Sequence, residues 1–147
     1  RMNPTSTYIK TTVAKPDKSC FVSFYQHIRR FRIYGKDGEL KRDVILDILP
    51  GQERPEVDDY LRFIHPISVY ATDSYIYTLN LDMTTEEIEN RKTTPNIQVF
   101  DWEGKPLTQY KLDCFINTFV VDEVANKIYG AFVEDEDHIY VFNLPRL

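Results

Sequence analysis

The stretch FIHPISVYATDSYIYTLN, residues 63–80, aligns without a gap with FINTFVVDEVANKIYGAF, residues 115–132. Each copy contains two runs of alternating β-branched and aromatic residues, separated by a short polar stretch. Such runs with a turn between them are typical of two adjacent antiparallel strands. The sequence therefore repeats a strand pair at an offset of 52 residues.

Two further matches extend this repeat. Ile33–Asp47 aligns with Val99–Asp113 and keeps Gly38 over Gly104, while Asn96–Asp101 reappears as His138–Asn143. Their offsets, 66 and 42, differ because the loops between strands have unequal lengths. The complete unit is a module of four strands. Repeats of about 40 to 50 residues built only from strands are typical of propeller blades.

We therefore expect an all-β chain of about three four-stranded antiparallel blades, at approximately residues 7–47, 60–113 and 114–147. A closed propeller has roughly four to eight blades, so the chain corresponds to about half of one. It begins at Arg1, without an initiator methionine, and ends at Leu147, where the third blade would continue into its outermost strand. We interpret the sequence as a C-terminal fragment, or as a half that pairs with something else.

The strand pattern can be placed along the chain. The expected strands cover residues 8–13, 21–26, 30–34 and 40–46 in the first blade, 63–70, 75–80, 97–100 and 107–112 in the second, and 116–121, 127–133 and 138–143 in the third. Only Thr84–Asn90, with a cap-like Thr followed by acidic residues, predicts one or two helical turns. The Asp-Gly turn that ends at Gly38 predicts a tight hairpin with positive φ.

Composition and charge argue against two kinds of partner. The net charge is -5, and general nucleic-acid binding needs clustered Lys and Arg, for which Arg29, Arg30 and Arg32 are too few. No apolar stretch is long enough to span a bilayer. Cys20 and Cys114 have neither metal-binding spacing nor a catalytic motif around them, and we interpret them as buried free thiols.

Loop lengths indicate where binding is concentrated. Two connections are long, residues 48–62 and 81–96, and in a propeller both emerge on the same face of the disc. Long loops on a rigid scaffold usually carry function. Charged side chains in and near these loops, among them Glu53 and Glu56, form a candidate binding site. Its other members are His27, Arg29, Arg30, Arg54, Asp58, Asp59, Arg62 and His65. The plainer interpretation is a solvated loop beside a soluble sheet edge.

Motifs for catalysis, metals and cofactors are weak. Glu134–Asp137 is an acidic turn beside His138, and its carboxylate oxygens are of the kind that coordinates calcium. The turn lacks the residue spacing of a known calcium loop, and this favours a solvated turn. The three histidines lie far apart, and no hydrolase, metalloprotease or phosphate-binding motif is present. We therefore predict no catalytic residue, no metal site and no cofactor.

The segment Asn96–Asp113, followed by Phe119–Glu123 and Lys127–Gly130, resembles the six-bladed TolB-like propellers of Bacteroidetes, distant relatives of NHL-repeat proteins. The resemblance covers the last two blades well and the first weakly. It implies a six-bladed ring whose N-terminal segment supplies the missing outer strand of the last blade. It also implies an extracytoplasmic location, periplasmic or lipid-anchored. It transfers no catalytic residue, because none is matched.

Three function hypotheses follow. The favoured one is a binding or interaction scaffold that recognises a protein, peptide or glycan through the two long loops. The second is an enzyme, a hydrolase or lyase, in which carboxylates and His65 at the channel mouth act on a glycan or lactone. The third is structural: either further blades or a second copy of the chain completes the ring, because a free blade face would expose apolar surface and strand edges.

Overall fold

The computed structural model describes residues 8–46, 61–91 and 93–147. They form three antiparallel sheets, and this confirms the predicted all-β fold of propeller blades. Blade 1 contains β1 (Lys10–Ala14), β2 (Cys20–Tyr25), β3 (Arg30–Gly35) and β4 (Leu40–Ile45). Blade 2 contains β5 (Phe63–Ala71), β6 (Tyr75–Thr84), β7 (Asn96–Asp101) and β8 (Pro106–Lys111). Blade 3 contains β9 (Thr118–Asp122), β10 (Lys127–Phe132) and β11 (Asp135–Asn143).

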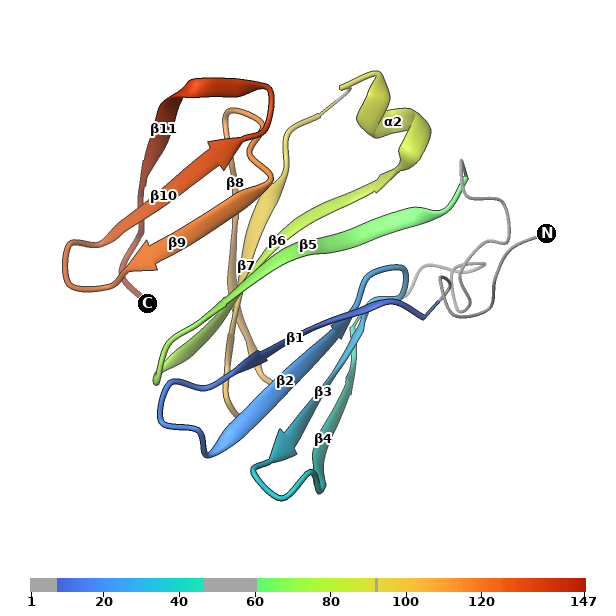
Figure 1. The fold of residues 1–147 in the computed structure, drawn as a ribbon, viewed down its shortest axis with the longest axis vertical. Coiled ribbons are helices and arrows are strands. Elements are labelled where there is room, and N and C mark those ends of the chain that lie inside the picture. Colours follow the sequence, from blue (N-terminus) through green and yellow to red (C-terminus); the bar gives the residue numbers. More distant parts are fainter. Residues whose placement is uncertain (1–7, 47–60, 92) are drawn as a thin grey trace.

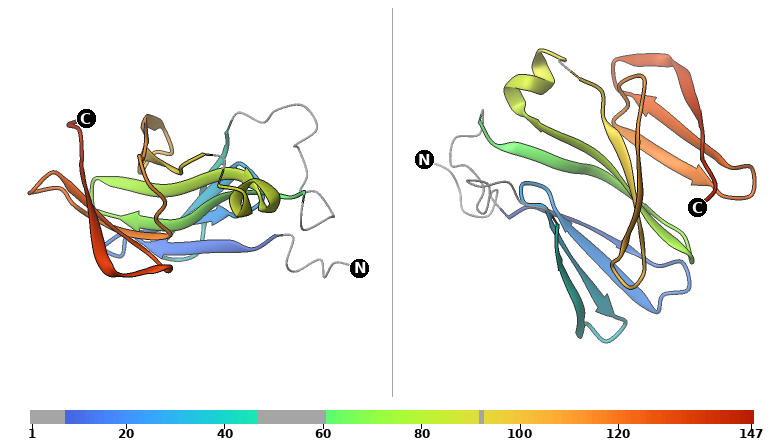
Figure 2. Two further views of the ribbon diagram at one scale, coloured as in Figure 1. Left: turned by 90° about the horizontal axis from the view of Figure 1, so that it is seen from above. Right: turned by 180° about the vertical axis from the view of Figure 1, so that it is seen from behind.

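Within each sheet the strands are hydrogen-bonded in sequence order. The first strands of the three sheets lie side by side, with β5 between β1 and β9, and the sheets fan out from them (Figure 1). The chain ends beside blade 3, where residues 144–147 lie near Tyr75 and Tyr77 of blade 2, and blade 1 lies on the other side of blade 2 (Figure 2). Blade 2 is therefore the central layer and packs on a neighbour with each of its faces.

Alternation along the strands of blade 2 sends side chains to both neighbours. Ile76 and Phe100 face blade 1 and pack with Val22, Phe24, Phe31 and Ile33. Tyr77, Leu79, Ile97 and Val99 face blade 3 and pack with Ile116, Phe119, Val121 and Ile128. A strand that is buried on both faces loses the alternation of apolar and polar residues. This burial explains the apolar runs in the sequence of blade 2.

The two ends of the sheets carry different kinds of connection. Gly38 and Gly104 have φ of 83° and 87° in the turns β3–β4 and β7–β8, as the Asp-Gly turn predicts. These turns mark what we call the turn end of the molecule. The opposite, helix end carries the connections β2–β3, β6–β7 and β10–β11 and the single helix of the described residues, α2 (Thr85–Glu89).

The helix follows the predicted capping pattern. The Thr84 side chain accepts a hydrogen bond from the Glu87 backbone N–H, and the Glu87 carboxylate accepts one from the Thr84 backbone N–H. The largest difference from the expected strand boundaries is in β6. This strand continues to Thr84 instead of ending at Asn80, because Met83 and Thr84 still pair with Ile64 and Phe63 at the start of β5. The second long connection is correspondingly shorter than the sequence predicts.

Candidate functional site

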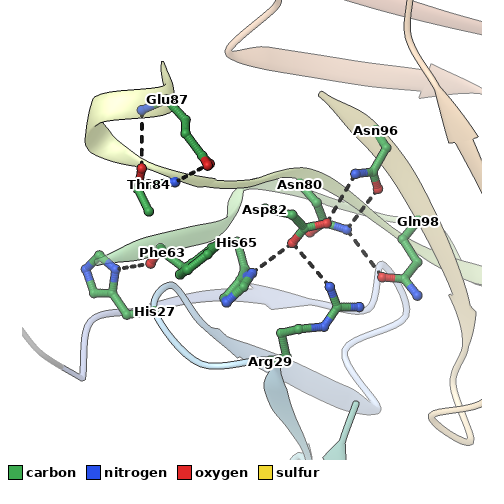
Figure 3. A network of polar contacts seen from close by, with 10 residues as sticks. All are labelled: His27, Arg29, Phe63, His65, Asn80, Asp82, Thr84, Glu87, Asn96 and Gln98. Carbon is green, nitrogen blue, oxygen red and sulfur yellow. Dashed lines mark hydrogen bonds and ion pairs between the residues drawn. The ribbon is translucent and has the colours of Figure 1, made fainter. Parts of the chain in front are cut away.

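Asp82 is the centre of a polar network at the helix end, between blades 1 and 2 (Figure 3). His65 Nδ1 lies 2.8 Å from Asp82 Oδ1, Asn96 Nδ2 donates to Asp82 Oδ2 at 3.2 Å, and Arg29 Nη1 lies 3.5 Å from Asp82 Oδ1. The three partners come from β5, β7 and the β2–β3 connection. One carboxylate therefore links blade 1 to three strands of blade 2.

The backbone of β6 has an unusual conformation at Asp82. Asp82 has φ of 51°, a left-handed conformation that Asp tolerates better than most residues. Burial by itself would raise the pKa of Asp82, but the hydrogen bonds from His65 and Asn96 and the charge of Arg29 hold that pKa below its ordinary value. Asp82 is accordingly a carboxylate at neutral pH.

Amide side chains extend the network along the blade 2 face. Asn80 Nδ2 donates to Gln98 Oε1 at 3.3 Å and reaches Asn96 Oδ1 at 3.5 Å. Thr78, the next residue towards the turn end on the same face of β6, donates its hydroxyl to the Gln98 backbone carbonyl at 3.4 Å. Beyond Thr78 the same face becomes apolar at Ile76. The interface of blades 1 and 2 is thus polar at the helix end and apolar at the turn end.

The space enclosed by this network is small. The cavity has a volume of about 10 Å³ and is lined by Arg29, His65, Asn80, Asp82 and Gln98 together with apolar residues of both blades. This is roughly the space that one water molecule needs. A sugar ring or a peptide side chain does not fit there, so the network joins two blades and is not a ligand pocket.

The predicted site residues have different environments. His65 is 5% exposed and belongs to the network with Arg29. His27 Nδ1 lies 2.9 Å from the Phe63 backbone carbonyl oxygen, which links the β2–β3 connection to the start of β5. Arg62 is also buried.

Arg30 faces away from these residues. Its Nε and Nη2 bind both oxygens of Asp43 on the free face of blade 1, at 2.8 and 2.5 Å. Glu53, Arg54, Glu56, Asp58 and Asp59 lie outside the described residues, and their part in a site stays a prediction.

Sequence reasoning missed the residue that holds the network together. Asp82 lies in a stretch that we expected to be loop, and the amides were not singled out at all. A signal was present, because Thr78, Asn80 and Asp82 are polar at every second position of an otherwise apolar run. In a strand this pattern gives one face that becomes polar towards its end.

The acidic turn at β10–β11 uses its carboxylates internally. Asp135 accepts hydrogen bonds from the Tyr140 hydroxyl at 2.5 Å and from His138 Nδ1 at 2.9 Å. These bonds, the one from Tyr140 first, lower the pKa of Asp135 to about 2. Glu134 pairs with Arg91 of blade 2. Within the described ranges, no group of three or more His, Cys, Asp or Glu side chains is arranged to hold a metal ion.

A larger hollow lies at the turn end, between blades 2 and 3. It has a volume of about 270 Å³, is lined by Tyr75, Tyr77, Glu123 and Asn126 and by residues 144–147, and adjoins a second hollow of about 530 Å³ beside Asp101 and Leu107. Tyr77 donates its hydroxyl to Glu123 at 3.3 Å. Sequence reasoning did not predict this hollow, because its walls come from segments that are far apart in the chain.

Comparison with known proteins supports the fold. A family model described as TolB-like 6-blade propeller-like matches residues 67–124, which extend from β5 to the β9–β10 turn. The crystal structure of Saccharomyces cerevisiae Sqt1 superposes with a TM-score of 0.58 at 9% sequence identity, covering 93% of this chain and 33% of that one. No curated protein matches the sequence. In the described part of the chain, no helix has the length and apolar character needed to cross a membrane. The chain is thus similar, over its central blade, to six-bladed TolB-like propellers, and it spans about a third of the propeller-like Sqt1.

Proposed function

We propose that the chain is an interaction scaffold of propeller blades that binds a protein, peptide or glycan at its helix end. One observation carries this proposal. Blades 1 and 3 connect their second and third strands through a few residues, whereas blade 2 inserts α2 and the segment up to Pro95 at that place. An elaboration on one copy of a repeated module is where a scaffold acquires specificity.

The network around Asp82 supports such a role indirectly. It fixes β6 and the β2–β3 connection directly beneath α2, and a rigid support lowers the entropy lost when a surface binds its partner. The binding surface in this proposal consists of α2, the connection of residues 48–62, and the residues predicted there, among them Arg54, Asp58, Asp59 and Arg62. His27, Arg29 and His65 position this surface from below.

Arrays of immobilised peptides and glycans, probed with the labelled chain, test the proposal. Glu86 is exposed on α2, and we expect Glu86→Arg to remove binding to the array positions that the unaltered chain recognises. Glu39→Arg makes the same charge reversal at the turn end, where Glu39 is exposed, and should leave those positions bound. Equal loss in both variants, or no bound position at all, would contradict the proposal. Loss with Tyr75→Ala in place of Glu86→Arg would move the binding surface to the hollow at the turn end.

We further propose an extracytoplasmic location, in the periplasm or anchored at the cell surface. The support is the similarity to TolB-like propellers, a family that is often periplasmic. Fractionation of cells that express the natural gene with a C-terminal tag tests it. Recovery of the tagged protein in the cytosolic fraction would contradict the proposal.

A further inference from the structure

The polar cavity between blades 1 and 2 has a buried hydrogen-bond donor in its wall. Arg29 Nε is buried, and within the described part of the chain it has no hydrogen-bond partner. The Arg29 guanidinium contacts Asp82 through Nη1, at 3.5 Å. A buried N–H without an acceptor destabilises a protein, because folding removes the hydrogen bond that the group makes to water. We therefore expect an acceptor for Arg29 Nε in this cavity, which Arg29 lines.

Two amide side chains offer further hydrogen-bonding groups to the same cavity. The amide nitrogen of Asn80 donates to Gln98 Oε1 and reaches Asn96 Oδ1 (Figure 3). Asn80 Oδ1 and Gln98 Nε2 take no part in these bonds, and both side chains line the cavity. An amide oxygen is an acceptor and an amide nitrogen is a donor. The cavity wall thus combines a donor from blade 1 with a donor and an acceptor from blade 2.

The charges around the cavity disfavour an ion. Arg29 is positively charged and Asp82 negatively charged, and both line the cavity. A cation would lie near the guanidinium and an anion near the carboxylate, so either ion would meet a like charge where little water screens it. A neutral molecule that both donates and accepts hydrogen bonds avoids this repulsion.

The volume of the cavity restricts such a molecule to the size of water. The cavity measures about 10 Å³, which is close to the least space that one water molecule needs, and a buried water also needs about two to four polar partners. Arg29 Nε, Gln98 Nε2 and Asn80 Oδ1 are three such groups. Apolar residues of both blades, among them Phe24 and Phe100, form the rest of the wall.

We propose that this cavity is a binding site for one structural water molecule. The water accepts hydrogen bonds from Arg29 Nε and Gln98 Nε2 and donates one to Asn80 Oδ1. It thereby bridges blade 1 to blade 2 and satisfies the buried guanidinium nitrogen. Water-mediated bonds of this kind are nearly as favourable in enthalpy as direct ones. This inference does not depend on the proposed function.

A high-resolution crystal structure of the chain tests the proposal directly. We expect an ordered water within about 3.2 Å of Arg29 Nε and of at least one of the Asn80 and Gln98 amides. Crystals grown in sodium bromide distinguish a water from an anion, because bromide scatters X-rays anomalously and water does not. An anomalous peak in the cavity, a protein side chain that accepts from Arg29 Nε, or no density beside Arg29 Nε would overturn the proposal.

Magnetic relaxation dispersion of the water oxygen tests the same site in solution, because it counts the water molecules that stay bound while the protein tumbles. Gln98→Met keeps the length of the side chain and removes its amide, so we expect one long-lived water fewer than in the unaltered chain. Gln109→Met is the matched control. Gln109 pairs with Gln98 across β7 and β8, but it is exposed and lies outside the cavity lining, and the count should stay the same. Circular dichroism spectra verify that both variants are folded. An unchanged count in Gln98→Met, or an equal loss in both variants, would contradict the proposal.

Discussion

The two interfaces of blade 2 solve the same packing problem with different chemistry. Towards blade 3, Tyr77, Leu79, Ile97 and Val99 form an apolar layer, and the pairs Tyr77 with Glu123 and Arg91 with Glu134 lie at its rims. Towards blade 1, the apolar layer ends at Ile76 and Phe100, and a hydrogen-bonded network around Asp82 replaces it. Apolar layers tolerate changes in register more easily than hydrogen bonds do. The polar interface therefore restricts how blades 1 and 2 can pack, at the end where α2 lies.

The largest expected effect comes from truncating a buried aromatic side chain in the apolar part of the interface between blades 1 and 2. The Phe100 ring lies 4.8 Å from Phe31 and 5.7 Å from Phe24, centroid to centroid, and is fully buried. Phe100→Ala leaves a cavity and should lower the free energy of unfolding by about 3–5 kcal/mol. Urea denaturation measures this change in the free energy of unfolding. Leu79→Ala is the matched change in the other interface, at about 2–5 kcal/mol. A loss below about 1 kcal/mol for Phe100→Ala would show that the two blades do not pack as described.

A substitution that places the residue type of blade 2 at the equivalent position of blade 3 sharpens the comparison between the two interfaces. Gly130 of blade 3 aligns with Thr78 of blade 2, and a Cβ at Gly130 would lie 2.6 Å from Ile116 Cδ1. Ile116 is fully buried and has little room to move, so Gly130→Thr should destabilise the fold by about 1–3 kcal/mol through overpacking. Ala131→Thr, the neighbouring change on the outward face, is the control and should have a much smaller effect. Equal effects at both positions would mean that close packing at Gly130 is unimportant.

These two positions illustrate what could be predicted from the sequence. The repeat aligned Gly130 with Thr78 and predicted the strands and their glycine turns, apart from boundaries such as the end of β6. The capping pattern predicted the helix. Each of these features depends on residues close together in the chain. The chemistry of the interfaces depends on pairs such as Arg29 with Asp82, which lie in different blades. A single sequence does not show which faces meet, so the predicted site contained His65 and Arg29 but not the carboxylate between them.

The Asp82 network should make the polar interface sensitive to acid. Asp82→Asn should cost about 1–3 kcal/mol at pH 7, because His65 and Arg29 lose their anionic partner. The folded-state pKa of Asp82 is lowered, so the unfolded state binds more protons as the pH falls. The stability that Asp82 contributes is complete above its ordinary pKa and is lost as the pH falls through the lowered value. Urea denaturation of both proteins between pH 7 and pH 3 should show the difference shrinking at the acid end. A constant difference would contradict this role for the ionised carboxylate.

The smallest effect is expected from the ion pair at the rim of the apolar interface. Arg91 and Glu134 have side chains that are 47% and 62% exposed, and the Arg91 guanidinium lies 5.0 Å from the centre of the Phe132 ring. A double-mutant cycle with Arg91→Ala and Glu134→Ala should give a coupling of at most about 1 kcal/mol, which high salt removes. The matched cycle, Arg29→Ala with Asp82→Ala, involves side chains that are each 25% exposed, and its coupling should be larger and should persist in salt. Equal couplings with equal salt dependence would mean that both arginines act as surface charges. The two interfaces would then differ only in their apolar parts.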